Sequence, residues 1–125
     1  MPRYVRVNVS ARIVDGKALG IEIQKEVSER VSSLKGQGVV PHLAVVIAGD
    51  HPASHVYVRN KERACERCGI ISTRIDMPGS SNLEEILGVV SSLNSDPNIH
   101  GILVQSPAPD AVSYTHLTLP TKRIV

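Results

Sequence analysis

The sequence contains no tryptophan and no phenylalanine, and its three tyrosines make up the 2% of aromatic residues in a chain of 125. The core must therefore be built from Val, Ile, Leu and Ala, which suits a buried sheet flanked by helices. Proteins that bind single-stranded nucleic acid stack the bases on aromatic rings. Because aromatic residues are scarce and the net charge is only +2, we expect no nucleic-acid partner.

Long apolar runs are also missing. No stretch approaches the roughly 18 apolar residues that a bilayer span requires, and the chain does not open with the apolar segment of a signal peptide. We therefore expect no membrane association and a cytoplasmic location. The first 14 residues hold three arginines and no acid. We interpret residues 1–12 as an N-terminal extension, and a mitochondrial location is the alternative.

Cysteine is limited to Cys65 and Cys68, spaced C-x-x-C. This spacing alone could indicate redox or metal chemistry. A second pair of ligands is missing, however, and the two cysteines fall inside a helix-like stretch and not at its start. We interpret them as ordinary reduced thiols and expect no metal site, with a redox pair as the alternative.

The first regular pattern follows Asp15, which can cap a helix. Ile23, Val27, Val31 and Leu34 recur at spacings of four, four and three, while charged residues occupy the positions between them. This pattern predicts an amphipathic helix of about five turns.

Strands and helices alternate along the remainder of the chain. We expect strands at residues 43–47, 71–75 and 99–105, and helices at residues 54–67 and after a capping box formed by residues 81–84. Such alternation implies an α/β fold with three layers, α/β/α, around a mostly parallel sheet. Ligands of parallel sheets gather beyond the carboxyl ends of the strands. The two candidate positions are the loop after Ile47 and the segment that begins at Gln105.

Tyr57 and Lys61 are four residues apart in the expected second helix, so their side chains share a face. An aromatic ring beside an ammonium group, close to a ligand-binding edge, can hold a flat heterocycle and move protons. A pair with this spacing is more often surface packing, and spacing alone does not establish catalysis.

The longer string around this pair is more specific. Residues 51–65, HPASHVYVRNKERAC, resemble the N-P-A-S-x-x-Y-V-x-x-K-x-K-A-C string of the bifunctional methylenetetrahydrofolate dehydrogenase/methenyltetrahydrofolate cyclohydrolase family. Three other segments, residues 14–17 (VDGK), 41–46 (PHLAVV) and 93–105 (LNSDPNIHGILVQ), resemble the family's I-D-G-K, P-x-L-A-V-V and L-N-x-D…I-x-G-I-L-V-Q motifs in the same order. The resemblance covers residues 13 to about 109, and it implies the N-terminal domain of that family.

The resemblance implies a role for five residues. Lys61 matches the family's catalytic lysine, which serves the attack of water on the methenyl carbon of the folate. Tyr57 matches the tyrosine that packs on the folate and orients this lysine, and Gln105 matches the glutamine that contacts it. These three are the expected catalytic residues. The expected substrate-binding residues are Ser54, Tyr57, Gln105 and Pro107.

The resemblance also implies the reactions of a parent enzyme in one-carbon folate metabolism. Such an enzyme oxidises 5,10-methylenetetrahydrofolate with NADP and hydrolyses 5,10-methenyltetrahydrofolate to 10-formyltetrahydrofolate, and it is expected to be a homodimer. We expect no cofactor-binding residue in this chain. The alternatives are a monofunctional relative, either dehydrogenase or cyclohydrolase, and a non-catalytic α/β binding module.

Two departures from the family pattern follow Gln105. The family reads L-P-L-P where residues 106–109 read SPAP, and we expect Ser106 to weaken the packing around the folate ring. The family's later K-D-V-D-G motif and its Gly-rich nucleotide-binding turn do not occur in this sequence. We therefore interpret residues 13–111 as a truncated folate-binding catalytic domain and residues 112–125 as an artefactual tail without family pattern. With the nucleotide-binding domain absent, we expect this chain to be inactive.

Overall fold

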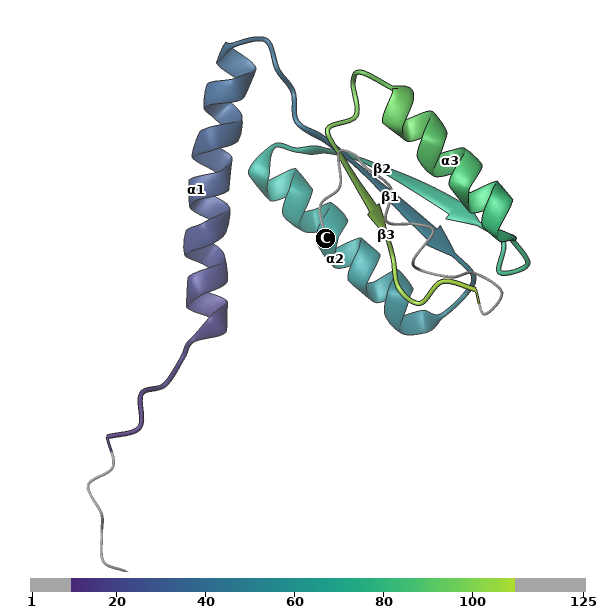
Figure 1. Ribbon diagram of the computed structural model, residues 1–125. Coiled ribbons are helices and arrows are strands. Elements are labelled where there is room, and N and C mark those ends of the chain that lie inside the picture. The colour runs from purple at the N-terminus through teal and green to yellow at the C-terminus, as the bar shows by residue number, and fades with distance from the viewer. Residues whose placement is uncertain (1–9, 110–125) are drawn as a thin grey trace, which may run out of the picture.

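Strands and helices alternate along the whole described part of the chain (Figure 1). The structure is a computed structural model and describes residues 10–109. Its elements are α1 (Gly16–Gly36), β1 (His42–Ala48), α2 (Pro52–Cys68), β2 (Ile71–Met77), α3 (Leu83–Ser95) and β3 (Gly101–Val104). This order confirms the predicted α/β class.

The three strands form one parallel sheet in the order β2-β1-β3. The central strand, β1, is apolar after its first residue, His42, and its residues Ala44 to Ile47 are buried. A strand with neighbours on both edges and helices on both faces needs an apolar side chain at every position. All three strands run in the same direction, so their carboxyl ends lie at one edge of the sheet.

Helices α2 and α3 cover opposite faces of this sheet. Successive side chains of a strand point to opposite faces. Val45 packs with the fully buried Val58 of α2, whereas Ala48, three positions along the strand, packs against the buried Ile86 of α3. The predicted three-layer arrangement is confirmed.

Helix α1 stands outside these layers and packs beside α2, away from α3 (Figure 1). The predicted cap is confirmed, since the Asp15 side chain accepts a hydrogen bond from the Ala18 N–H at 3.0 Å. Of the predicted apolar stripe, Val31 is buried, but Ile23 is 50% and Leu34 is 37% exposed. Within the described residues, the stripe is therefore covered only in part.

The predicted capping box of α3 was wrong by one residue. The N-cap is Asn82, whose side chain accepts from the Glu85 N–H at 2.9 Å while the Glu85 carboxylate accepts from the Asn82 N–H at 3.0 Å. Ser81 is engaged in the preceding turn, where its hydroxyl donates to the Pro78 carbonyl. The sequence holds two overlapping capping patterns, and the helix uses the second because the first serine is occupied.

Smaller differences concern the ends of the elements. Helix α2 begins two residues before the predicted start and ends at Cys68, one residue after the predicted end. The next residue, Gly69, has the left-handed φ of +79° that favours glycine after a helix. Strand β3 is shorter than predicted, and β2 lies at the sheet edge with Ile71 49% exposed. No helix in residues 10–109 has both the length and the apolar character needed to cross a membrane.

The packing of α2 on the sheet predicts a contrast between two valines of this helix. We expect Val58→Ala to lower the free energy of unfolding by about 2 kcal/mol, because it removes two fully buried methyl groups and leaves a cavity. Val56→Ala is the matched control, since Val56 is 52% exposed and its truncation should change stability by less than about 0.5 kcal/mol. Urea denaturation of both variants measures the difference. Equal effects would contradict the proposed packing.

Candidate active site

The candidate site lies where β1 ends and α2 begins. The turn between them depends on Gly49, whose φ of +93° is rarely adopted by other residues. The Gly49 N–H donates to the Met77 carbonyl at 3.0 Å, which ties the end of β1 to the end of β2. Pro52 occupies the first turn of α2, where a missing N–H has no cost and the fixed φ suits a helix. The helix therefore starts directly above the carboxyl edge of the sheet.

Three of the predicted site residues meet at this edge. The Lys61 Nζ of α2 donates to the Gln105 Oε1 at 3.1 Å, although the two residues are 44 positions apart. Gln105 follows β3, and its N–H donates to the Val46 carbonyl at 2.8 Å. The Lys61 Nζ also lies 5.7 Å from the centre of the Tyr57 ring. An amine and a phenol of α2 thus share one location with an amide that follows β3.

The amide of Gln105 has a defined orientation. Its Nε2 donates to the Ser106 carbonyl at 3.1 Å, and the hydroxyl of the buried Ser54 donates to the same carbonyl at 3.1 Å. Since a carbonyl can only accept, the amide nitrogen must face Ser106 and the amide oxygen must face Lys61. The first turn of α2 and the segment after β3 are therefore linked by a continuous set of hydrogen bonds.

Tyr57 and Pro107 lie at the surface of this location. Tyr57 is 56% exposed, so this residue is open to the surroundings of the protein. Pro107 is exposed and is joined to Ser106 by a cis peptide bond. The structure thus brings Lys61, Tyr57, Gln105 and Ser54 together and places Pro107 two residues after Gln105. Their catalytic and binding roles stay predictions.

The hydrogen-bond partner of the Lys61 amine is a neutral amide and not a carboxylate. Among residues 10–109, Arg74 and Asp76 form the one ion pair. A carboxylate beside an amine favours the charged form of the amine, whereas a neutral amide orients it without adding a negative charge. Gln105 therefore orients the amine without adding a charge beside it.

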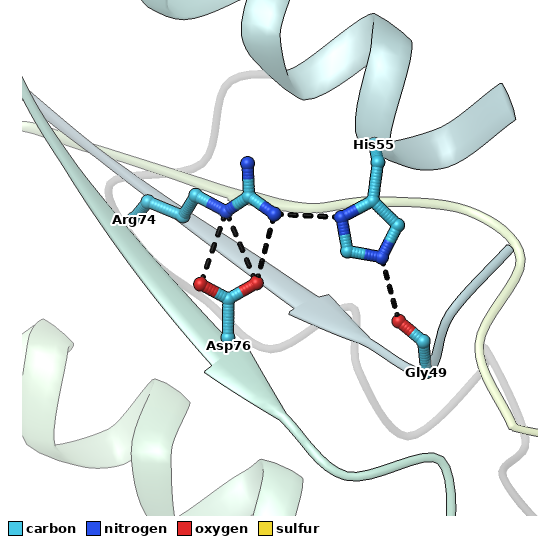
Figure 2. Close-up of polar contacts among 4 residues, drawn as sticks. All are labelled: Gly49, His55, Arg74 and Asp76. Carbon is cyan, nitrogen blue, oxygen red and sulfur yellow. Dashed lines mark hydrogen bonds and ion pairs between the residues drawn. The ribbon is translucent and has the colours of Figure 1, made fainter. Parts of the chain in front are cut away.

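A second polar cluster, which the sequence analysis did not identify, joins His55, Arg74, Asp76 and Gly49 (Figure 2). The Arg74 Nη2 and the His55 Nδ1 lie 2.6 Å apart, and the His55 Nε2 lies 3.0 Å from the Gly49 oxygen. Arg74 also donates to both carboxylate oxygens of Asp76 at 3.0 Å, and this hydrogen bonding raises the pKa of the Arg74 guanidinium. The spacing of Arg74 and Asp76 was an available signal, because residues two apart on a strand share a face.

Comparison with known proteins supports the family resemblance of the sequence. The model of the family described as tetrahydrofolate dehydrogenase/cyclohydrolase, catalytic domain, matches residues 14–120. The chain belongs to this family. It is 52% identical over 102 residues to the bifunctional protein FolD of Moorella thermoacetica, a match that covers 82% of this chain and 36% of that protein. The chain thus spans about a third of the length of the curated relatives that it matches.

Solved structures of the family share the fold. The bifunctional FolD enzyme of Campylobacter jejuni superposes with a TM-score of 0.77 at 43% identity, covering 79% of this chain and 35% of that one. A 5,10-methylenetetrahydrofolate dehydrogenase of the silkworm Bombyx mori superposes with a TM-score of 0.80 at 41% identity, and the match covers 83% of this chain and 36% of that one. The Trypanosoma brucei dehydrogenase-cyclohydrolase, complexed with NADP cofactor and an inhibitor, superposes with a TM-score of 0.80 at 32% identity, and the match covers 86% of this chain and 37% of that one.

The predicted domain boundaries stay predictions. The family match begins at residue 14 and runs to residue 120, whereas the predicted family domain ends at residue 111. Most of the predicted extension at residues 1–12 lies outside the described residues. The predicted tail at residues 112–125 lies entirely outside them.

The two cysteines of this family member are free and buried in α2. Burial, followed by the proximity of Cys68 and then of Glu62, raises the pKa of the Cys65 thiol. The Cys68 Sγ donates to the Gln24 carbonyl at 3.6 Å. Reactive cysteines need surroundings that lower the thiol pKa, so this environment favours the interpretation as ordinary thiols over the redox pair. Within residues 10–109, no group of three His, Cys, Asp or Glu side chains could hold a metal ion.

This environment predicts slow alkylation. In the folded chain at pH 8, we expect iodoacetamide to label Cys65 and Cys68 at least about tenfold more slowly than in the chain unfolded by guanidinium, because both thiols are buried and the thiolate of Cys65 is disfavoured. Because burial disfavours the Cys65 thiolate, the folded state keeps its full stability below the unfolded pKa and loses stability as the pH rises from there through the raised folded pKa. Mass spectrometry of timed samples gives the rates. Rapid labelling at neutral pH would support the redox alternative.

Proposed function

We propose that this chain is the folate-binding catalytic part of a methylenetetrahydrofolate dehydrogenase/methenyltetrahydrofolate cyclohydrolase. The observation that carries the proposal is the hydrogen bond from Lys61 to Gln105 beside the exposed ring of Tyr57. Family membership supplies the folate substrate, and this geometry supplies an amine and a flat surface at the edge of the sheet where ligands of such folds bind.

In the cyclohydrolase step, water adds to the methenyl carbon of cationic 5,10-methenyltetrahydrofolate. Lys61 accepts one proton of the attacking water as the new C–O bond forms. The bond between this carbon and the ring nitrogen then breaks, the nitrogen takes the proton from Lys61, and the hydroxyl becomes the formyl C=O by releasing its proton to solvent. Gln105 holds the amine through its amide oxygen, so that the amine keeps its place when its charge changes. The cationic substrate disfavours a charged amine beside it, so it favours the neutral form of Lys61, which can accept a proton. Addition of water removes the positive charge of the substrate, and with it the obstacle to a charged amine.

Substrate placement is assigned to the residues around this amine. The exposed face of Tyr57 packs on the folate ring, and Ser54 holds the Ser106 carbonyl and with it the segment that leads to Pro107. Positioning of this kind supplies a large part of the rate enhancement of many enzymes. Ser106 replaces an apolar residue of the family motif, and we propose that it weakens the packing around the ring.

The dehydrogenase step belongs to the complete parent enzyme. Hydride transfer needs a nicotinamide, and the cofactor supplies that chemistry while the protein supplies its placement. The Trypanosoma brucei relative is described with NADP, and we propose NADP for the parent of this chain. This sequence has no Gly-rich turn of the family's nucleotide-binding type. No step of hydride transfer is therefore assigned to its residues, and we propose that the chain alone is inactive.

The silkworm relative gives a specific reason to consider a second function. It is described as a 5,10-methylenetetrahydrofolate dehydrogenase and is 41% identical to this chain, so a monofunctional parent is the alternative candidate. We further propose a homodimeric parent in the cytoplasm.

A chimaera tests the proposed function. Residues 14–105 of this chain would replace the matching segment of the Moorella thermoacetica FolD protein, which supplies the remaining length. We expect the chimaera to hydrolyse methenyltetrahydrofolate, and we expect Lys61→Ala to reduce this rate at least about 100-fold, the usual contribution of a group that transfers a proton. The rate is followed by the absorbance of the methenyl form.

The matched control is Lys25→Ala, which removes an exposed lysine of α1 and should leave the rate unchanged. Full activity of the Lys61→Ala chimaera would exclude the assigned role of this lysine. A chimaera that oxidises methylenetetrahydrofolate but hydrolyses no methenyl form would favour the monofunctional alternative.

A further inference from the structure

The cluster of His55, Arg74, Asp76 and Gly49 has no role in the proposed reaction, yet it lies beside the turn that leads to Lys61. His55 is in the first turn of α2 and Arg74 is on β2, 19 positions later. In Figure 2 the imidazole lies between the guanidinium on one side and the Gly49 carbonyl on the other. The ring thus connects the start of α2 with two of the three strands of the sheet.

The partners of His55 determine where its proton must be. A guanidinium can only donate hydrogen bonds, so the Nδ1 that faces Arg74 must accept with its lone pair. A carbonyl can only accept, so the Nε2 that faces Gly49 must carry the hydrogen. Both contacts are satisfied together only by a neutral imidazole with its proton on Nε2. The ion pair with Asp76 keeps Arg74 charged and in place.

The first turn of α2 depends on such contacts because its cap is weak. The N-cap residue, His51, makes no side-chain hydrogen bond to the helix. The turn is held instead by two adjacent residues that reach outward: Ser54 donates to the Ser106 carbonyl after β3, and His55 binds the end of β1 and the side chain from β2. Together these contacts tie one helical turn to Arg74 of β2 and to the backbone just after β1 and β3.

We propose that His55 and Arg74 are positioning residues, which hold the first turn of α2 on the sheet through a single imidazole tautomer and thereby set the contact of Lys61 with Gln105. The geometry carries this inference without any ligand. Lys61 reaches Gln105 only if α2 keeps its place along the sheet edge, and the His55 contacts fix that place at the β1 and β2 side while Ser54 fixes it at the β3 side.

Nuclear magnetic resonance of the isotopically labelled 125-residue chain tests the proposal. Long-range ¹⁵N–¹H correlations should show one neutral tautomer of His55, with the hydrogen on Nε2. In Arg74→Gln the tautomers should mix, because a glutamine side chain can either donate or accept. A tautomer with the hydrogen on Nδ1, or a mixture in the unmodified chain, would overturn the proposal without any variant.

The positioning role is tested by two changes at His55. We expect His55→Ala to speed amide hydrogen exchange at Ser54 by about tenfold, the effect of losing one hydrogen bond to a charged group, and to shift the side-chain amide resonances of Gln105. We expect His55→Gln to restore both signals, since glutamine can accept from Arg74 and donate to Gly49. Arg67→Gln is the matched control, because Arg67, like His55, links α2 to a side chain of another element. The Arg67 Nε donates to the Gln24 Oε1 of α1 at 2.9 Å.

The Arg67 variant should leave Ser54 and Gln105 unchanged. Unchanged signals in His55→Ala, or equal shifts in the His55→Ala and His55→Gln variants, would reject the positioning role. If His55→Ala unfolds the chain, the comparison of the unmodified chain with Arg74→Gln and His55→Gln still decides it. All these readouts are made without folate, so a failure of the chimaera assay would reject the proposed reaction and leave this inference standing.

Discussion

The hydrogen bond from the Gln105 N–H to the Val46 carbonyl, 2.8 Å long, is the constraint on which the candidate site depends. It continues the pairing of β3 with β1 by one residue, past Val104, so the glutamine leaves the sheet at the edge where β1 also ends. Helix α2 starts at this edge and carries Lys61 across it. A shift of β3 by one residue would turn the glutamine to the other face of the sheet, where no lysine of α2 could reach it.

The parts of the fold that depend on local signals could be predicted from the sequence. The unbroken apolar run around Val45 predicts a strand that is covered on both faces, because only such a strand needs an apolar residue at every position. Asp15 marks the start of α1 through a hydrogen bond within one turn, and Gly69 marks the end of α2 through its left-handed conformation. Each signal acts within a few residues, so the sequence contains it directly.

The contacts between distant segments could not be derived from local patterns. Lys61 and Gln105 are 44 positions apart, and only the resemblance to a family, not their spacing, predicted that they meet. The partner of His55 is an arginine on the edge strand, and no periodicity distinguishes it from a solvent-exposed arginine. The burial of the α1 stripe also depends on what lies beside the helix, which a periodic pattern does not specify. Ile23 belongs to this stripe and is 50% exposed. An amphipathic pattern therefore predicts a helix with one apolar face, but it does not predict which element covers that face.

Both polar clusters at the sheet edge use partners whose hydrogen-bonding character does not change with pH. An amide oxygen and a backbone carbonyl accept, and a guanidinium donates, throughout the range in which proteins are folded. Lys61 and His55 are the side chains that these partners orient. Because Gln105 accepts from the amine, it fixes the direction of Lys61 without adding a charge. Because Arg74 only donates and the Gly49 carbonyl only accepts, they fix the direction of the His55 ring and the nitrogen that carries its hydrogen. One edge of the sheet thus holds two oriented side chains, and the second keeps the helix that carries the first in place.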